Sequence, residues 1–528
     1  MAVIETPPET VDGATAMAHP TSRTRTSGLA GVLGSGDHKV VGRCYVIAAL
    51  VFGAGVIVLG ALFSVEAIAP SSLDVFGRET VFQFFTLYRV GSLFLLAFPL
   101  VIGVAMVVVP LQVGARSIAF PRAAAASFWM WLMGSVLLMA AYAINGGPGG
   151  GRESGVNLWI TALGLIVLAI LVAATCLATT VLALRAPGVT LDRSPLYAWS
   201  VAVAAIMWLV TLPVLFAELV LIYVAHRHGA SGFGDNAAIY DRLAWVFRNP
   251  QIYTLAVPVL GFAADVLATT ARARFGFRSV VQGAIAAFGV FGFGAFLATA
   301  ESVDVESPIV ILLGLLAILP IFAVAATSAD LFRRGTLRVN AGVVYAVAAM
   351  LALLLGVAAG ALGSVPQLDT AGTIFDLGTG HAVMLAAVIA SLGGLHWWAT
   401  KVMGQPAKEA PGLVAPLLLL VGTAAIVIPD LASGLFGEGA ELNPSYTGGI
   451  KALNVVVAVG VVVLVLGFLS ALASLAPALK ATGDVAADPW EGQTLEWLTA
   501  SPPPLENFTG DLAEVRSPEP LVDLREER

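Results

Sequence analysis

Long apolar stretches recur along this chain, and they limit its possible folds more than any other feature. A helix needs roughly 20 apolar residues to cross about 30 Å of hydrocarbon. Short polar loops separate the stretches that meet this requirement. The sequence therefore predicts an all-α integral membrane protein of about twelve transmembrane helices. The predicted spans are residues 41–65, 82–110, 126–145, 157–184, 196–225, 246–271, 279–300, 308–330, 339–363, 375–400, 411–436 and 450–479.

The composition agrees with lipid as the solvent. Hydrophobic residues make up 58% of the 528 residues and charged residues only 12%, which is too few to cover a water-soluble globule. The net charge of −7 comes without a basic patch, so no nucleic-acid partner is expected. We expect a disordered cytoplasmic tail over residues 1–37, a membrane domain over 38–480 and a cytoplasmic C-terminal tail over 481–528.

Basic residues predict the orientation of the bundle, because they favour cytoplasmic loops. They gather before the first predicted span and in alternate loops after it, which places both termini in the cytoplasm. The excess of arginine over lysine hints at a GC-rich bacterium and hence at a bacterial plasma membrane. The basic residues that set this orientation include Arg23, Arg25, Lys39, Arg43, Arg116, Arg122, Arg185, Arg193, Arg272, Arg274, Arg278, Arg333, Arg334, Arg338, Lys401 and Lys408.

Four separated motifs carry a family resemblance. Residues 37–43 read DHKVVGR, residues 109–122 contain VPLQVGA followed by AFPR, residues 249–253 read NPQIY, and residues 488–504 contain DPW, TLEW and SPPP. Together and in this order they resemble subunit I of the heme–copper oxidases, the catalytic subunit of cytochrome c oxidase. The resemblance covers residues 37 to 508, and it implies a twelve-helix subunit I-like bundle with cytochrome-c oxidase activity.

Histidines decide whether the implied activity is credible. The family holds a low-spin heme between its second and tenth helices, a high-spin heme on the tenth, and copper B through three histidines of helices six and seven. Imidazole is the usual neutral nitrogen ligand for these metals. No histidine lies between His38 and His226 or between His228 and His381, so the second, sixth and seventh helices offer none. The histidines of the chain are His19, His38, His226, His228, His381 and His396.

Other residues stand where the resemblance places the cofactor ligands. Tyr88 occupies the low-spin position on the second helix, Asn249 a copper position and Thr379 the high-spin position, while His381 keeps the low-spin position on the tenth helix. We therefore predict that heme and copper B are absent and that the chain has no catalytic or metal-binding residues. The complete set of degenerate cofactor positions is Tyr88, Asn249, Ala295, Phe296, Thr379 and His381.

Proton-path residues of the family are replaced as well. Gln251 stands in place of a glutamate on the sixth helix, and Val324 in place of a lysine on the eighth. Tyr253 remains where family enzymes have a tyrosine cross-linked to a copper ligand, although its partner position is the asparagine at 249. An ordinary buried tyrosine is the favoured interpretation of Tyr253.

Ionisable residues inside the predicted spans are expected to face the bundle interior, because each costs roughly 2.5 to 3.5 kcal/mol in lipid. Arg89, Glu218, Asp265 and Asp376 form the predicted intramembrane polar network. Since the second and tenth helices of the family face each other, we expect Tyr88 and Arg89 to approach His381 and Asp376.

These observations leave three functions open. The first is a non-catalytic subunit I homologue that acts as a membrane scaffold or accessory subunit, in contact with membrane lipid and other oxidase or respiratory-complex subunits, including a catalytic paralogue. The second is a proton, lipid or quinone pathway through the emptied cofactor cavities. The third is a terminal oxidase subunit with substitute ligands. Heme and metal content separates the third from the other two.

Overall fold

The structure is a computed structural model. It describes residues 31, 34–69, 75–77, 80–229, 236, 238–293, 308–439, 448–479 and 485–527. Most of the predicted N-terminal tail, including His19, lies outside these residues. So do Ala295 and Phe296, together with the end of the span predicted at 279–300.

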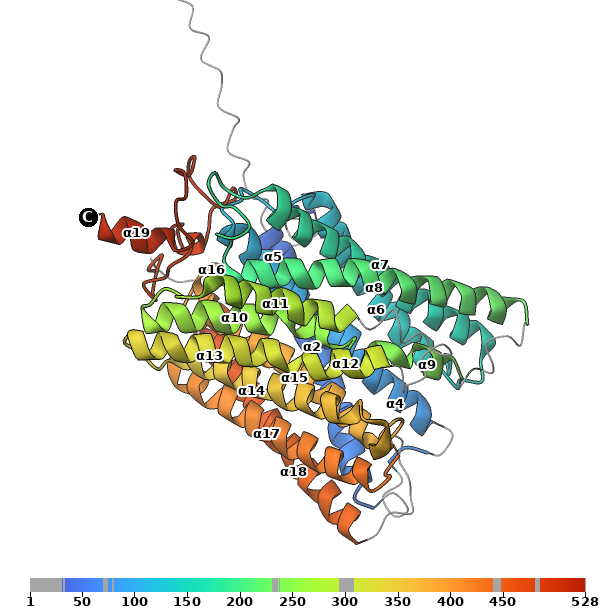
Figure 1. Ribbon diagram of the computed structural model, residues 1–528. Helices are drawn as coiled ribbons and strands as arrows, with labels where there is room; N and C mark the ends of the chain where they lie inside the picture. The colour runs from blue at the N-terminus through green and yellow to red at the C-terminus, as the bar shows by residue number, and fades with distance from the viewer. Residues whose placement is uncertain are drawn as a thin grey trace, which may run out of the picture. The chain divides into compact units, whose positions relative to one another are not determined.

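The described residues fold into helices without a β-sheet, which confirms the all-α prediction (Figure 1). The long helices have both the length and the apolar composition needed to cross a membrane. The helices are α2 (His38–Glu66), α4 (Val81–Val90), α5 (Phe98–Gln112), α6 (Pro121–Ala143), α7 (Glu153–Ala183), α8 (Leu196–Arg227), α9 (Ala238–Leu243), α10 (Tyr253–Ala271), α11 (Arg278–Phe291), α12 (Pro308–Leu316), α13 (Ile318–Arg334), α14 (Ala341–Gly363), α15 (Ile374–Trp397), α16 (Ala399–Val402), α17 (Glu409–Leu435), α18 (Gly449–Leu475) and α19 (Pro520–Glu526).

Eleven spans, rather than twelve, meet the length and hydropathy requirement within the described residues. The difference lies at α11, which is apolar but ends at Phe291, two residues before the described chain is interrupted. The span predicted to begin at 246 begins at Tyr253 instead, because Pro250 disfavours helical geometry in the residue before it. The stretches α4 and α5 form one span, as do α12 and α13.

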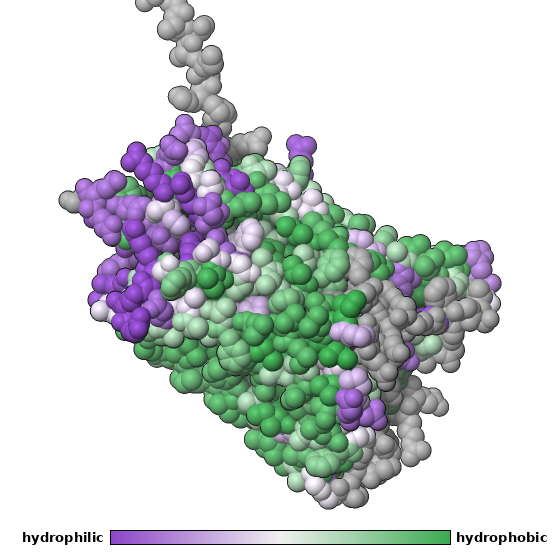
Figure 2. Space-filling model, in the orientation of Figure 1, coloured by the Kyte–Doolittle hydropathy of each residue, from purple (hydrophilic) through white to green (hydrophobic). Residues whose placement is uncertain are grey.

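Burial follows the hydrophobic pattern of each helix. Every residue of α5 is buried, and α5 is apolar on all sides, as expected of a helix at the centre of a bundle. Helices α2, α6 and α18 instead expose apolar side chains such as Val51, Val136 and Val459, which suits contact with lipid. Figure 2 shows hydrophobic side chains over the helices and hydrophilic ones gathered around α19 and the C-terminal tail.

Small residues let the helices approach closely, as membrane bundles without a hydrophobic drive between helices require. A Cβ on Gly42 of α2 would lie 2.6 Å from the carbonyl oxygen of Gly103 on α5. A Cβ on Gly422 of α17 would lie 2.7 Å from the backbone nitrogen of Leu464 on α18. Larger residues at these positions would separate the helix pairs.

The C-terminal tail packs on one end of the bundle. Asn507 accepts hydrogen bonds from Lys39 (3.0 Å) and donates one to the Ala115 carbonyl (2.8 Å). The Trp490 ring stacks on Trp397 with the ring centroids 4.6 Å apart. The DHK motif therefore binds the tail at Asn507, and the DPW motif packs on the end of α15, so both motifs hold the tail against the helix ends.

Candidate functional site

Tyr88 of α4 and His381 of α15 meet in the membrane interior. The Tyr88 hydroxyl lies 2.9 Å from His381 Nε2, at hydrogen-bond distance, and the two rings pack edge to face. His381 is buried, and Tyr88 borders a cavity. The structure thus brings together the two residues that the resemblance assigned to the low-spin heme position.

A π-helical segment, Gly91–Ala97, follows Tyr88 and joins α4 to α5. Such single-turn segments change the direction in which neighbouring side chains point, and they occur often at functional sites. Ser92 at its start donates a hydrogen bond to the Tyr88 carbonyl (2.7 Å). This segment is not predictable from the sequence, since its apolar pattern is that of an ordinary helix.

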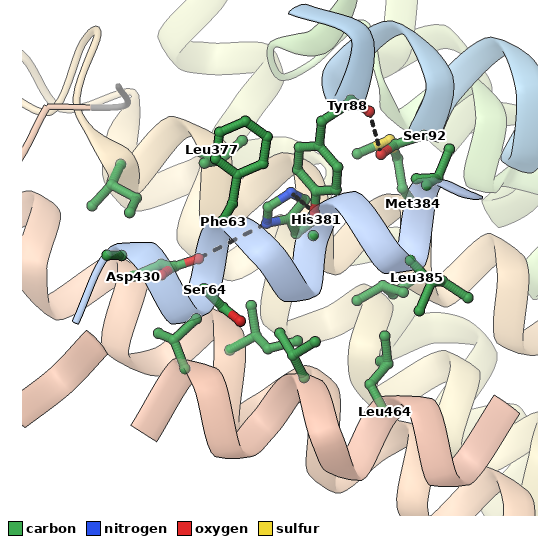
Figure 3. A pocket seen from close by; sticks show the side chains of 18 of the residues that line it. Phe63, Ser64, Tyr88, Ser92, Leu377, His381, Met384, Leu385, Asp430 and Leu464 are labelled. Atoms are coloured by element: carbon green, nitrogen blue, oxygen red, sulfur yellow. Dashed lines mark hydrogen bonds and ion pairs between the residues drawn. The ribbon is translucent and has the colours of Figure 1, made fainter. Parts of the chain in front are cut away.

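Asp430 of α17 faces the other side of the His381 ring. Its Oδ2 lies 3.9 Å from His381 Nδ1, and the carboxyl group is almost fully buried (Figure 3). Asp430 was not among the predicted polar residues. A single acid inside the apolar stretch 411–436 was the available signal, because acids within membrane spans are expensive and usually face a site.

Arg89 points away from the Tyr88–His381 pair. Its Nε donates to the Tyr240 hydroxyl (3.2 Å), and its guanidinium lies 4.9 Å from the centroid of the Phe247 ring. Within the described part of the chain it has no carboxylate partner, and Asp376 instead accepts a hydrogen bond from the Gly372 amide (3.1 Å). The structure does not pair Arg89 with Asp376.

Glu218 and Asp265 lie in separate places. Glu218 accepts a hydrogen bond from the Trp245 indole (2.8 Å). Asp265 accepts from the amides of Leu196 and Tyr197, both at 3.0 Å, and so caps the N-terminus of α8 from the neighbouring helix α10. The four predicted residues therefore do not form one continuous network.

A second acidic group lies where the tail covers the bundle. Gln112 Nε2 donates to both Asp265 and Glu496, each at 3.1 Å, and the Trp398 indole donates to Glu496 (3.2 Å). Burial, together with the nearby charge of Asp265, raises the pKa of Glu496 to about 7. In the sequence, Glu496 is distinguished only as part of the TLEW motif of the tail.

Helix α14 packs closely against the residues around the family's copper position. The Asn249 side chain donates to the Gly360 carbonyl (2.9 Å), and a Cβ on Gly360 would lie 2.1 Å from the Tyr253 hydroxyl. Tyr253 stacks on Phe288 with the centroids 5.6 Å apart. Thr379, at the high-spin position, donates its hydroxyl to a carbonyl of its own helix. These residues serve helix packing.

The residues at the family's cofactor positions do not fit the cofactors. A low-spin heme would need a histidine from each of two helices, whereas α4 offers the Tyr88 hydroxyl, which is hydrogen-bonded to His381 Nε2 (2.9 Å). Copper B needs three imidazoles, and here the Asn249 amide is already hydrogen-bonded to α14. Among the residues that the structure describes, no three histidine, cysteine or acidic side chains cluster as metal ligands.

The fold and the site together define a polytopic helical membrane protein in which Tyr88 of α4 meets His381 of α15 inside the bundle. The chain belongs to the family described as Cytochrome C and Quinol oxidase polypeptide I, whose model matches residues 40–469. This confirms the resemblance drawn from the motifs.

Curated relatives and a solved structure agree with this membership. The chain is 29% identical to the putative cytochrome c oxidase subunit 1-beta of Streptomyces coelicolor, over 92% of this chain and 89% of that protein. It is 27% identical to cytochrome c oxidase subunit 1 of Bacillus subtilis, over 94% and 84% of the two chains. A heme-copper terminal oxidase structure has the same fold, with a TM-score of 0.68 at 15% identity over 84% of each chain. The chain is thus a multi-pass membrane protein with bacterial relatives.

Proposed function

We propose that this chain is a non-catalytic homologue of cytochrome c oxidase subunit I, which acts as a membrane scaffold or accessory subunit of a respiratory complex. The observation that carries the proposal is the direct hydrogen bond between Tyr88 and His381, in which a tyrosine hydroxyl engages the histidine nitrogen that would hold a low-spin heme. One imidazole on one helix cannot form a bis-histidine clamp. Heme and copper B are accordingly absent from the proposed functional state.

Packing around the copper position supports the same proposal. The missing side chain of Gly360 allows α14 to approach Tyr253 and Asn249 so closely that even a methyl group would collide. An active centre between these helices would need room for a metal and for oxygen. Close packing without room for a cofactor is expected of a subunit whose role is assembly with other subunits.

The scaffold role draws on the contacts of the retained motifs. Residues of the DHK motif bind Asn507 of the tail, and Trp490 of the DPW motif stacks on Trp397. These interactions are structural and require no cofactor. The proposed partners of the chain are other oxidase or respiratory-complex subunits, including a catalytic paralogue.

The proposal is tested by purifying the chain in mild detergent and recording its optical spectrum, its iron and copper content and its co-purifying chains. We expect neither a Soret band nor stoichiometric metal, and we expect respiratory subunits in the preparation. Stoichiometric heme would overturn the non-catalytic role, and a lone monomer after chemical cross-linking in membranes would overturn the scaffold role.

A gain-of-ligand variant makes the spectrum more informative. Tyr88→His restores a histidine opposite His381, whereas Phe84→His introduces the same residue on an exposed position of the same helix. If the tyrosine is what prevents heme binding, Tyr88→His will take up more heme than Phe84→His. Equal uptake by both variants would show that the residue at position 88 does not control heme binding.

A further inference from the structure

A cavity of about 170 Å³ lies beside the Tyr88–His381 pair, between α2, α4, α15, α17 and α18 (Figure 3). Cavities of about 150 Å³ lined by apolar side chains bind a single benzene ring. The cavity therefore has room for one ring or for an apolar segment of similar size, and it is too small for a porphyrin.

The lining of the cavity is divided by polarity. Its lining runs from Val56 of α2 to Ala67, just past the end of that helix, a length of about 16 Å at the rise of an α-helix. Polar side chains gather around the end that contains Asp430, Glu438 and Asn454, whereas the other end is apolar. The apolar end is formed by Val56, Leu96, Val388, Val461 and Leu464. A ligand that matches both ends has a polar head and an apolar body.

Two buried polar atoms at this site lack a hydrogen-bond partner among the residues that the structure describes. One is Nδ1 of His381, whose nearest carboxylate oxygen, on Asp430, is 3.9 Å away. The other is Oε2 of Glu438, whose Oε1 accepts from the Asn454 amide (3.2 Å). Both residues are buried and line the cavity. Leaving such atoms unpaired costs about 1–3 kcal/mol each, which a bound hydroxyl group would recover.

The charges nearby favour an uncharged ligand. The cavity has two carboxyl groups and neither lysine nor arginine in its lining, and burial raises the pKa of Glu438, which favours the neutral acid. The guanidinium of Arg89 lies on the other side of α15, with Nη1 3.6 Å from the position a Cβ would take on Gly380. A ligand cation next to His381 would therefore approach a buried positive charge.

We propose that the cavity binds a neutral amphiphile, whose hydroxyl head meets Asp430, Glu438 and His381 Nδ1 and whose body, one ring in size, lies between Val461 and Leu96. This inference rests on the proposed function, since it needs a cavity without heme. A substituted phenol is the simplest molecule of this class.

Binding is tested with three probes of nearly equal shape: 4-ethylphenol, ethylbenzene and the cationic 4-ethylbenzylamine. Calorimetric titration of the purified wild-type chain, in one detergent, gives the three affinities. We expect 4-ethylphenol to bind at least about fivefold more tightly than ethylbenzene, since the hydroxyl gains about one hydrogen bond. Tightest binding of the amine, or equal binding of phenol and ethylbenzene, would overturn the proposed head group.

Matched variants of α18 locate the site. Val461→Phe fills the cavity, whereas Val459→Phe places the same ring on an exposed position two residues away. We expect phenol binding to be lost in the first variant and kept in the second. If Val461→Phe does not fold, Val457→Phe narrows the same cavity. Equal binding by filled and control variants would show partition into detergent and overturn the site.

The spectrum of the same preparation separates the two proposals. A heme-bound chain overturns the proposed function and removes the basis of the phenol site. A heme-free chain that binds none of the probes overturns the phenol site alone and leaves the scaffold proposal standing.

Discussion

Docking of the C-terminal tail should weaken as the pH rises, because Glu496 must ionise while buried. Its pKa is about 7 in the docked tail, against an ordinary value of 4.5 for an exposed glutamate. Burial is the main cause, and its Oε2 has no hydrogen-bond partner within the described residues. The docked state therefore holds a proton that the undocked state has released.

The direction and size of this pH effect on tail docking follow from proton linkage. Between about pH 4.5 and pH 7 the docked state binds more protons, so its free energy advantage falls as pH rises through this window and then stays low. Each pKa unit is worth about 1.36 kcal/mol, and the difference of about 2.5 pKa units gives about 3 kcal/mol. Over this pH window, transient undocking of the C-terminal tail should become on the order of a hundredfold more frequent.

Hydrogen exchange of residues 485–527 measures this undocking. Glu496→Gln keeps an acceptor for Gln112 and Trp398 but cannot ionise, so the ratio of wild-type to variant exchange rates cancels the intrinsic pH dependence. We expect this ratio to rise steeply between about pH 5 and about pH 7. Glu506→Gln, at an exposed position of the same tail, should leave the wild-type profile unchanged. A flat ratio would refute the reasoning.

Three further substitutions test the packing by thermal unfolding. Tyr88→Phe leaves His381 Nε2 buried without its partner and should cost about 1–3 kcal/mol, so an unchanged midpoint would argue against the hydrogen bond. Gly360→Ala should cost about 1–3 kcal/mol through collision with the Tyr253 hydroxyl, and less when combined with Tyr253→Phe; equal costs would contradict this. Asp265→Ala removes the cap of α8 and should cost about 1 kcal/mol, while full stability would refute the capping role.

Hydropathy was sufficient to predict the class of fold, because the need to satisfy backbone hydrogen bonds in lipid leaves few alternatives to helices. Helix boundaries were less predictable. The span predicted from 246 begins at Tyr253, since local proline chemistry, invisible to a hydropathy average, ends the preceding turn. The pairing of Tyr88 with His381 followed from the family's helix order and not from either residue alone.

The partners of the buried polar residues could not be predicted from the sequence. Glu218 accepts from a tryptophan indole, and Asp265 accepts from two helix amides and from Gln112. These donors are far away in the sequence, and no sequence pattern predicts such pairs. Asp430 joins the His381 site only because α17 packs against α15 through Gly378 and its neighbours. The wall of the phenol site combines five helices, so its shape depends on the three-dimensional packing.

Heme and metal content of the chain, purified from a host without sister oxidases, tests the central claim most directly. We expect a spectrum without a Soret band, and iron and copper far below one atom per chain. A reduced-minus-oxidised heme spectrum with one iron per chain, lost in His381→Ala, would contradict it.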